Sequence, residues 1–471
     1  MAEKAVSRRT VLRAGAALAL SAPVLPAFAR TQPRFDVIVA GSGAGGFAAA
    51  IRAAENGARV LLLEANSWVG GASRVSTGIF GCAGHPIQKK LGFTATAEDL
   101  YKNYIGVAAA TRTKAKPEAA RILADGAVPA ADWLASLGVE WSTKKAQKFF
   151  LNIKEGHRLG ELLIDSLERR ARALGVEIRT RHRAERLLVK DGRIAGVRCR
   201  TTEGSKAFPA RAVVLATGGF EANPRMIDLY IGHGWGKAGI YCTPADRGDG
   251  QRMAEEAGAG LADMEVFKAN PTIHEYKGNR YNLRSVIRQG AIAVNGEGRR
   301  FMNETGSYYE SHRIWALPQK QAWVLFGDPA LEADPRLKKL VAAGDILRSE
   351  TLSGLARAIG AEESTLEVTL RRYEAMRKFG RDEDFGRGNL KEAFGGAWYA
   401  ARIQPMIQGT FGGVMTNVRT QALTPEGRVF PGLYAVGECA AAGLRGLNPQ
   451  TANAVFGSIA GREAAAYSRE A

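Results

Sequence analysis

Short aliphatic runs alternate with an alanine-rich stretch near the beginning of the chain. Residues 36–40 and 59–64 are rich in Val, Leu and Ile, as buried parallel strands are. Between them, residues 47–56 are rich in alanine and typical of a helix, which Gly57 ends. A strand, a helix and a second strand in this order predict an α/β fold with a parallel sheet.

The same kind of apolar run returns twice, far along the chain. Residues 212–215 predict a buried strand that ends in a turn of small residues. Residues 432–438 predict a further strand of this type, and a helix is expected to follow it over about residues 452–467.

Two local patterns predict elements between these strands. The Asp-Gly pair at residues 191–192 predicts a hairpin turn between two short apolar strands. Residues 364–379 predict an amphipathic helix whose apolar stripe, formed by Leu366, Leu370 and Tyr373, packs in a core.

Residues 1–29 have the three-part layout of an export signal. A charged start is followed by the apolar residues 14–25 and by a small-residue cleavage site that ends at Ala29. The apolar stretch is shorter than the roughly 20 residues that span a bilayer. Residues 7–13 resemble a twin-arginine signal, with an ordinary secretion signal as the alternative. The pattern predicts cleavage after Ala29 and a periplasmic protein without a membrane span.

Composition narrows the classes of partner. A length of 471 residues suggests two or three domains, and 46% hydrophobic with 24% charged residues is ordinary for a globular protein. The formal net charge is +18, but Lys and Arg are spread along the chain, so we expect no nucleic-acid binding. The charge would serve solubility or attract an anionic substrate or an acidic partner.

The cysteine spacing excludes several redox centres. Cys82, Cys199, Cys242 and Cys439 form no CxxC pair, so neither a metal site nor a haem attachment is expected, and the thiols should be isolated and buried. If electrons arrive from outside, they must then come from a carrier on another polypeptide, such as a cytochrome.

A glycine-rich loop directly follows the first predicted strand. Gly41 permits the tight turn, Gly43 lets the backbone approach a pyrophosphate, and Gly46 allows the helix to pack closely on the strand. The helix N-terminus then offers N–H groups and a partial positive charge to phosphates. Glu64 ends the second strand, where a carboxylate can accept ribose hydroxyls. Together they predict a dinucleotide site, in a pattern that serves both NAD and FAD.

The later glycine-rich segments indicate which of the two cofactors, NAD or FAD, the chain binds. With those at residues 70–78, 216–219 and 437–438, the chain resembles the flavoprotein subunits of fumarate reductase and succinate dehydrogenase. Their relatives include the soluble fumarate and urocanate reductases and the 3-ketosteroid dehydrogenases. The resemblance covers essentially the whole mature chain and implies FAD in a Rossmann-like domain of the GR2 type, interrupted by an α+β capping domain. The expected boundaries are 30–264 and 406–471 for the FAD domain and 265–405 for the cap.

The resemblance also implies which residues hold FAD. The residues expected to bind the pyrophosphate and the adenosine ribose are Gly41, Ser42, Gly43, Ala44, Gly45, Gly46, Glu64 and Ala65. Gly71, Ala72, Ser73, Thr77 and Gly78 are expected to line the flavin. Ala184 is expected to contact adenine, and Ala216, Thr217 and Gly218 to cover the rest of the nucleotide. Asp249, Gly437 and Glu438 would reach the flavin and ribityl side, and Asn453, Ala454 and Val455 would open the last helix against the flavin. Residues 73–77 include no histidine, so we expect noncovalent FAD.

The substrate-gripping residues of the dicarboxylate-reducing relatives are replaced in this chain. Where those relatives have two histidines and an arginine, the matching motifs read Asn270, Gly409 and Pro449. Tyr308 stands in the position of the proton-donating arginine. An arginine binds a carboxylate through a bidentate pair of hydrogen bonds, which none of these side chains can form. Fumarate and succinate are therefore not the expected substrates.

Tyr308 in that position resembles the 3-ketosteroid dehydrogenases, in which a tyrosine after an Asn-Glu motif moves a proton. The alternative is a tyrosine that packs in the cap. Arg284, Arg445 and Asn270 are the further candidates for contact with substrate, and Arg445 could equally face solvent or a phosphate.

The main hypothesis is an exported FAD enzyme that transfers hydride between flavin N5 and a carbon atom. The reaction would reduce a polarised C=C bond or run as the reverse α,β-dehydrogenation of a small organic substrate. One alternative is an oxidase that passes electrons to oxygen, and another is an exported flavin electron-relay protein without catalysis.

Overall fold

The computed structural model describes residues 35–76, 79–110, 116–306, 310–441 and 449–471. The predicted export signal lies outside these ranges. So do four predicted site residues, Thr77, Gly78, Tyr308 and Arg445. Phe35–Ala471 form one compact unit.

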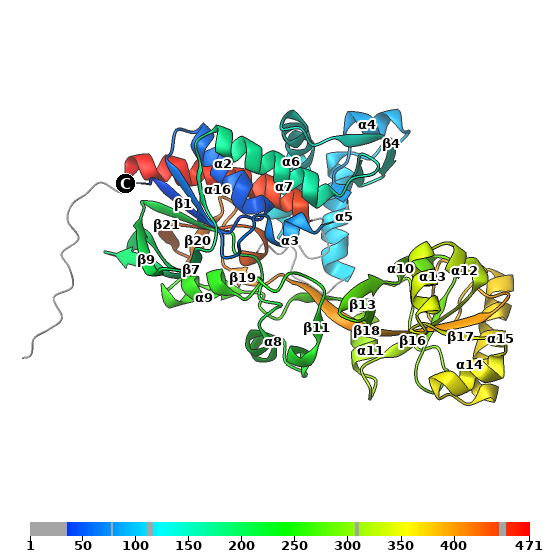
Figure 1. The fold of residues 1–471 in the computed structure, drawn as a ribbon. Coiled ribbons are helices and arrows are strands. Elements are labelled where there is room, and N and C mark those ends of the chain that lie inside the picture. Colours follow the sequence, from blue (N-terminus) through cyan, green and yellow to red (C-terminus); the bar gives the residue numbers. More distant parts are fainter. Residues whose placement is uncertain (1–34, 77–78, 111–115, 307–309, 442–448) are drawn as a thin grey trace, which may run out of the picture. The chain divides into compact units, whose positions relative to one another are not determined.

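A six-stranded sheet forms the centre of this unit, in the order β20-β21-β10-β1-β2-β6 (Figure 1). Its strands are β1 Val37–Ala40, β2 Val60–Leu63, β6 Glu177–Arg179, β10 Ala212–Leu215, β20 Gln421–Leu423 and β21 Val429–Ala435. All neighbours pair in parallel except β20 with β21. The central strands β1, β2 and β10 are buried along their whole length, which explains their continuous aliphatic runs. The predicted α/β class is confirmed.

Helices cover one face of this sheet and a smaller sheet covers the other. The helices are α2 Ala44–Glu55, α6 Pro117–Ser136, α7 Leu159–Ala173 and α16 Pro449–Glu470. Helices α2 and α16 lie side by side in Figure 1, and a Cβ added at Gly461 would stand only 2.2 Å from the carbonyl oxygen of Ala49. On the other face lie α9 Asp249–Glu256 and the antiparallel strands β7 Arg183–Lys190, β8 Arg193–Thr201 and β9 Gly204–Pro209.

The predicted hairpin turn joins β7 to β8. Lys190 pairs with Arg193 across a two-residue loop, in which Asp191 and Gly192 have φ angles of 51° and 72°. Positive φ at both positions matches the twist of the flanking strands, and Asp-Gly tolerates it well.

A seven-stranded sheet forms the centre of the predicted cap. Its main path is β14-β13-β18-β16-β15, and β11 and β17 also pair with β18. The strands are β11 Gly239–Ile240, β13 Phe267–Tyr276, β14 Asn279–Asn282, β15 Ile292–Val294, β16 Ala322–Gly327, β17 Leu347–Ser349 and β18 Trp398–Thr410. Strand β18 continues five residues past position 405, so the boundaries of the insertion stay a prediction.

Helices surround the cap sheet. They are α10 Arg284–Arg288, α11 Glu310–Trp315, α12 Asp328–Glu332, α13 Pro335–Ala342, α14 Leu352–Ile359 and α15 Glu363–Phe379. The predicted stripe Leu366, Leu370 and Tyr373 on α15 is buried in one cluster with Ile292 and Val294 of the sheet. This confirms its packing role.

Shorter elements complete the described chain. They are α3 Gly71–Arg74, β3 Ile79–Gly81, α4 Pro86–Lys90, α5 Ala97–Ala110, β4 Trp141–Gln147, β5 Phe150–Ile153, α8 Pro224–Tyr230, η1 Trp235–Lys237, β12 Leu261–Ala262, β19 Gly413–Val414 and η2 Gly437–Cys439. All four cysteines are free; Cys242 is partly exposed and the other three are buried.

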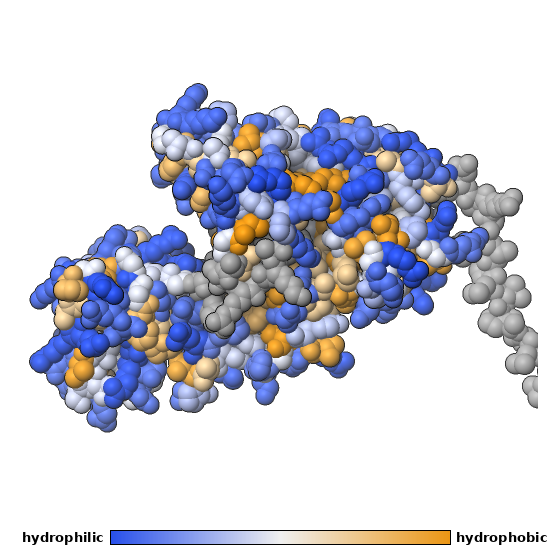
Figure 2. Space-filling view, turned by 180° about the vertical axis from the view of Figure 1, so that it is seen from behind, coloured by the Kyte–Doolittle hydropathy of each residue, from blue (hydrophilic) through white to orange (hydrophobic). Residues whose placement is uncertain are grey.

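The surface seen in Figure 2 is mainly hydrophilic, and hydrophobic residues gather beside the hollow in its middle. Within the described ranges, no helix has the length and apolar character needed to cross a membrane.

Candidate functional site

A cavity of about 840 Å³ lies where the parallel strands end. The segments that follow β1, β2, β10 and β21 all contribute to its wall, at residues 41–46, 64–66, 216–218 and 436–438. Ligands of open parallel sheets bind at this carboxyl edge, because the loops there converge and leave a crevice. The volume lies within the range of about 300–1,000 Å³ that is usual for small-molecule and cofactor sites.

The glycine-rich loop is closely packed and points the start of α2 into the cavity. Gly41 has φ +107°, and a Cβ there would lie 2.1 Å from the carbonyl oxygen of Ala216. The N-cap residue of α2 is Gly43, which has no side chain to cap the helix, and the first residues of α2 line the cavity. The backbone nitrogen of Ala44 donates a hydrogen bond to Ser73 Oγ at 3.1 Å. Free N–H groups and the helix dipole make this end suited to an anionic phosphate.

Glu64 is held in place at the end of β2. Its Oε2 accepts hydrogen bonds from the backbone nitrogen and the hydroxyl of Ser42, at 3.2 Å and 2.5 Å, and its Oε1 accepts one from the backbone nitrogen of Asn66 at 2.8 Å. A carboxylate can accept about four such bonds, so capacity for a ribose hydroxyl remains. The Asn66 side-chain nitrogen is buried without a partner in the described chain and also lies at the cavity. Such an orphaned donor suits a polar ligand.

Most of the residues that the resemblance implied meet around this one cavity. Those in its wall are Gly41, Ser42, Gly43, Ala44, Gly45, Gly46, Glu64, Ala65, Gly71, Ala72, Ser73, Ala184, Ala216, Thr217, Gly218, Asp249, Gly437, Glu438 and Asn453. They come from segments up to about four hundred residues apart, so their convergence is a property of the fold.

Ala454 and Val455 differ from the prediction. Neither lies in the cavity wall, and both are buried, at 3% and 7% exposure. A Cβ at Gly126 of α6 would lie 3.0 Å from Val455, so this side chain packs against that helix. The described helix α16 begins at Pro449, so these two residues lie in its second turn, and Pro449 and Gln450 line the cavity in their place.

Asp249 also differs in position. It was expected on the flavin and ribityl side, together with Glu438. Its carboxylate instead pairs with the guanidinium of Arg183 at 2.7 Å, directly beside Ala184, where adenine is expected. The reason is that Asp249 begins α9, and buried residues of α9 pack in one cluster with those of β7.

Sequence reasoning missed the side chains that reach the cavity from the cap strands and the connecting loops. These are Tyr241, Cys242, Ala245, Asp246, Lys268, Arg280, Gln408 and Phe411, together with Asn66, Val75, Ser76, Ile79, Phe150, His182, Arg183, Pro449 and Gln450. No motif marks most of them. Asn66, Ser76, Ile79 and Arg183 adjoin predicted residues and could have been found from them.

Two of the predicted substrate contacts, Asn270 and Arg284, are not among the residues that line the cavity. Asn270 is 1% exposed, and its side-chain oxygen accepts hydrogen bonds from the nitrogen and the hydroxyl of Thr272, both at 3.2 Å. Arg284 begins α10 and extends a guanidinium nitrogen to 3.4 Å from the carbonyl oxygen of Gly306. A role of either residue in contact with substrate therefore stays a prediction. Lys268 and Arg280 are the cap cations in the cavity wall.

Three histidines of the described chain have contacts of a structural kind. His85 caps α4 through its ring nitrogen, which accepts from the backbone nitrogen of Ile87 at 3.2 Å. His274 is buried and lies 2.5 Å from Asp345. His312 packs edge-on against Trp235.

Glu438 occupies the space next to Gly409. A Cβ at Gly409 would lie 2.9 Å from Glu438 Oε1. Burial raises the pKa of the Glu438 carboxyl well above its usual range, the nearby charge of Glu221 raises it further, and Lys268 opposes both effects. This part of the wall therefore carries carboxyl groups.

A second cavity of about 470 Å³ adjoins the first and shares Phe411, Gly437, Glu438, Pro449 and Asn453 with it. Its other lining residues are mostly apolar, among them Val418, Ala435, Ala440, Ala452 and Phe456. The space beside Asn453 and Glu438 thus suits a ligand with an apolar part.

Comparisons with known proteins agree with this geometry. The FAD binding domain family matches residues 36–455. The chain is 30% identical over 455 residues to a fumarate reductase (cytochrome) of Shewanella frigidimarina, covering 92% of this chain and 78% of that protein. It is 26% identical over 454 residues to a vinyl phenol reductase of Lactiplantibacillus plantarum, covering 88% and 91%.

The fold comparison gives the same result. The open conformation of a flavocytochrome c3 fumarate reductase superposes with a TM-score of 0.79 at 27% identity, over 92% of this chain and 78% of that one. The glycine loop, the start of α2 and the carboxylate of Glu64 fit the cofactor that this family binds. The chain belongs to the FAD binding domain family, and it is an FAD-dependent oxidoreductase of the class that acts on CH–CH bonds.

Proposed function

We propose that the protein transfers hydride between flavin N5 and a carbon atom of a small organic substrate other than fumarate or succinate. The reaction reduces a polarised C=C bond, or runs as the reverse α,β-dehydrogenation. The observation that carries the exclusion of these dicarboxylates is that the Glu438 carboxyl occupies the space in which a side chain at position 409 would begin.

In the dicarboxylate-reducing relatives that the chain resembles, a histidine precedes the Thr-x-Gly-Gly-Val motif. Here Gly409 stands there, and the Glu438 carboxyl fills the adjoining space. A carboxyl group in that position repels a substrate carboxylate or at best shares a proton with it. Asn270 is engaged by its own strand, and Pro449 provides no donor. These features favour a substrate with at most one carboxylate and with an apolar part for the adjoining cavity.

The residues of the chain have separate tasks in this reaction. The loop at residues 41–46 and the start of α2 bind the pyrophosphate, and Glu64 binds a ribose. Bound FAD supplies hydride chemistry at N5. Lys268 and Arg280 orient a carbonyl or a single carboxylate of the substrate, and Tyr308 holds the proton that accompanies the hydride. FAD is held without a covalent bond.

Reoxidation of the reduced flavin tests the reaction class. With the purified holoprotein photoreduced under argon, we expect an unsaturated monocarboxylate or an enone to restore the oxidised flavin spectrum, and fumarate to do so much more slowly. Peroxide formation on adding oxygen, without reoxidation by any unsaturated compound, would favour an oxidase. Failure of every small molecule would favour an electron-relay protein.

Replacement of Tyr308 by Phe tests the proton-transfer role. A positioned acid or base typically contributes about 10²–10⁴-fold, so we expect kcat to fall by about that factor while the flavin spectrum is retained. The variant Tyr101→Phe, on α5, is the control and should keep wild-type turnover. Unchanged turnover in Tyr308→Phe would remove this residue from the mechanism.

The proposal includes export and a separate electron carrier. Residues 1–29 support the twin-arginine route, because export of a folded protein lets FAD bind before translocation. The absence of a CxxCH motif supports a carrier on another chain, such as a cytochrome. Cell fractionation of the protein and of an Arg8→Lys, Arg9→Lys variant tests the route, since only the wild type should reach the periplasm.

A further inference from the structure

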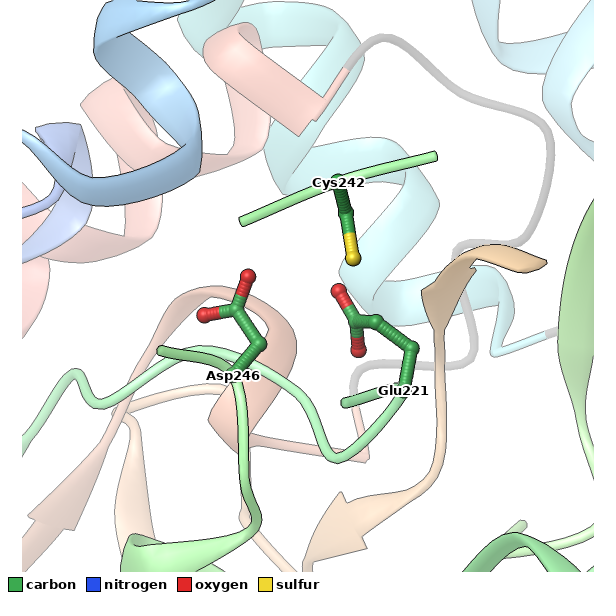
Figure 3. A group of neighbouring side chains, drawn as sticks. All are labelled: Glu221, Cys242 and Asp246. Atoms are coloured by element: carbon green, nitrogen blue, oxygen red, sulfur yellow. The ribbon is translucent and has the colours of Figure 1, made fainter. Parts of the chain in front are cut away.

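Two acidic side chains and a thiol face one another beside the main cavity. Glu221, Cys242 and Asp246 each direct one polar atom to the same point, and these three atoms lie within 4.8 Å of one another (Figure 3). Glu221 is 2% exposed and Asp246 is 5% exposed. The two carboxyl groups are thus close together and almost completely removed from water.

The hydrogen bonds around this group leave two oxygens without a donor. The Phe220 backbone nitrogen donates to the Thr410 hydroxyl at 2.9 Å, so this hydroxyl donates its own proton to Glu221 Oε2, at 3.1 Å. Glu221 Oε1 and Asp246 Oδ2 are buried and have no partner among the described residues. A buried oxygen of this kind requires a donor.

The charges around the pair do not compensate two carboxylates. Glu438, Glu64 and the Cys242 thiol add acidic groups, and Lys268, which acts on Glu438, is the facing cation. Burial raises the pKa of Glu221 and of Asp246 well above the usual range. The charge of Asp246 raises the pKa of Glu221 further, and the charges of Glu438 and Glu64 raise that of Asp246, whereas hydrogen bonding to Thr410 and Cys242 lowers the pKa of Glu221 and hydrogen bonding to Glu221 lowers that of Asp246. Two close carboxyls without a cation between them cannot both ionise, so they titrate as a pair.

Asp246 connects this pair to the cavity. It lies in the cavity wall, and a Cβ at Gly218 would stand 2.1 Å from Asp246 Oδ1. Gly218 belongs to the predicted nucleotide segment at residues 216–218. The pyrophosphate of FAD is anionic, so each negative charge on this pair of carboxyls opposes binding.

We propose that Glu221 and Asp246 hold one proton between them, so that the pair places one negative charge and not two beside the cavity that binds FAD. Binding of the anionic cofactor then favours retention of this proton. By linkage, loss of the proton at higher pH weakens the affinity for FAD. This inference rests on the cofactor and does not depend on the identity of the substrate.

The test is the FAD dissociation constant of the holoprotein as a function of pH. It is measured by dilution with flavin fluorescence as the readout, from about pH 5 to about pH 9. For the wild type we expect a constant value below the raised pKa of the pair. Above it, the dissociation constant should rise and approach a tenfold increase per pH unit, or about 1.4 kcal/mol. In Asp246→Asn the side chain is uncharged at every pH, so this rise should be absent.

Asp249→Asn is the matched control. It makes the same change in the same cavity wall, but at a carboxylate that is paired with Arg183. It should bind FAD more weakly than the wild type and keep the pH-dependent rise. Equal pH profiles for wild type and Asp246→Asn would overturn the proposal.

Two measurements avoid dependence on one variant. The wild-type holoprotein should show a protonated-carboxyl infrared band near neutral pH that shifts in D₂O and is lost in Glu221→Gln. Metal analysis of the same preparation should find no stoichiometric divalent cation. A cation that co-purifies and is lost in Cys242→Ser would mean that a metal ion, and not a proton, lies between the carboxyls, and would overturn the proposal.

Discussion

Replacing Gly46 with alanine is expected to produce a protein that purifies almost without flavin. A Cβ at this position would lie 2.0 Å from the carbonyl oxygen of Gly41 and 3.2 Å from the Ala216 side chain. Contact this short with backbone forces α2 away from the loop, and overpacking in a tight interior costs about 1–3 kcal/mol. We expect FAD affinity to fall about 100-fold, or about 2.7 kcal/mol, as measured by flavin fluorescence on dilution.

Gly106→Ala provides the control for this change. Gly106 lies within α5, and a Cβ there would meet nothing within 4 Å. Alanine favours a helix over glycine by about 1 kcal/mol, so this variant should be at least as stable as the wild type and fully yellow. Normal FAD content in Gly46→Ala would show that α2 can move without harm, and would contradict the close-packing argument.

Replacing Glu304 with alanine is expected to destabilise the protein by about 3–5 kcal/mol, because it leaves two buried guanidinium groups with Asp382 as their one remaining carboxylate among the described residues. Its carboxylate accepts from Arg300 at 2.9 Å and from Arg387 at 3.3 Å, and its side chain is fully buried. Arg300 also pairs with the buried Asp382 at 2.9 Å. The measurement is the free energy of unfolding in urea, followed by fluorescence.

The control is Glu367→Ala on the surface of α15. Glu367 pairs with Arg371 at 2.6 Å, one helical turn away, and both side chains are exposed. Pairs of this kind contribute about 0.3–0.5 kcal/mol. A loss for Glu304→Ala as small as this control would mean that water or another carboxylate replaces Glu304. Glu304 lies four residues before Tyr308, so Glu304→Ala should also reduce turnover.

The sequence alone determined the FAD domain well, because its signals are local. A fully buried strand must be aliphatic throughout, so the runs at residues 36–40 and 212–215 could be recognised without a structure. Glycine is required at positions 41 and 46, because a Cβ atom at either would lie about 2 Å from a backbone carbonyl oxygen. The Asp-Gly turn and the stripe on α15 depend on short-range geometry in the same way.

Only the tertiary structure decided which polar side chains reach the cavity. Asn270 and Arg284 carry the right chemistry, but in the fold Asn270 hydrogen-bonds with Thr272, and Arg284 with the carbonyl oxygen of Gly306. Asp249 pairs with Arg183 across two elements. Glu221 and Asp246 are ordinary acidic residues until the fold removes both from water at the same point. The physical reason is that desolvation and charge pairing depend on neighbours distant in sequence, whereas strand burial and glycine turns are encoded in adjacent residues.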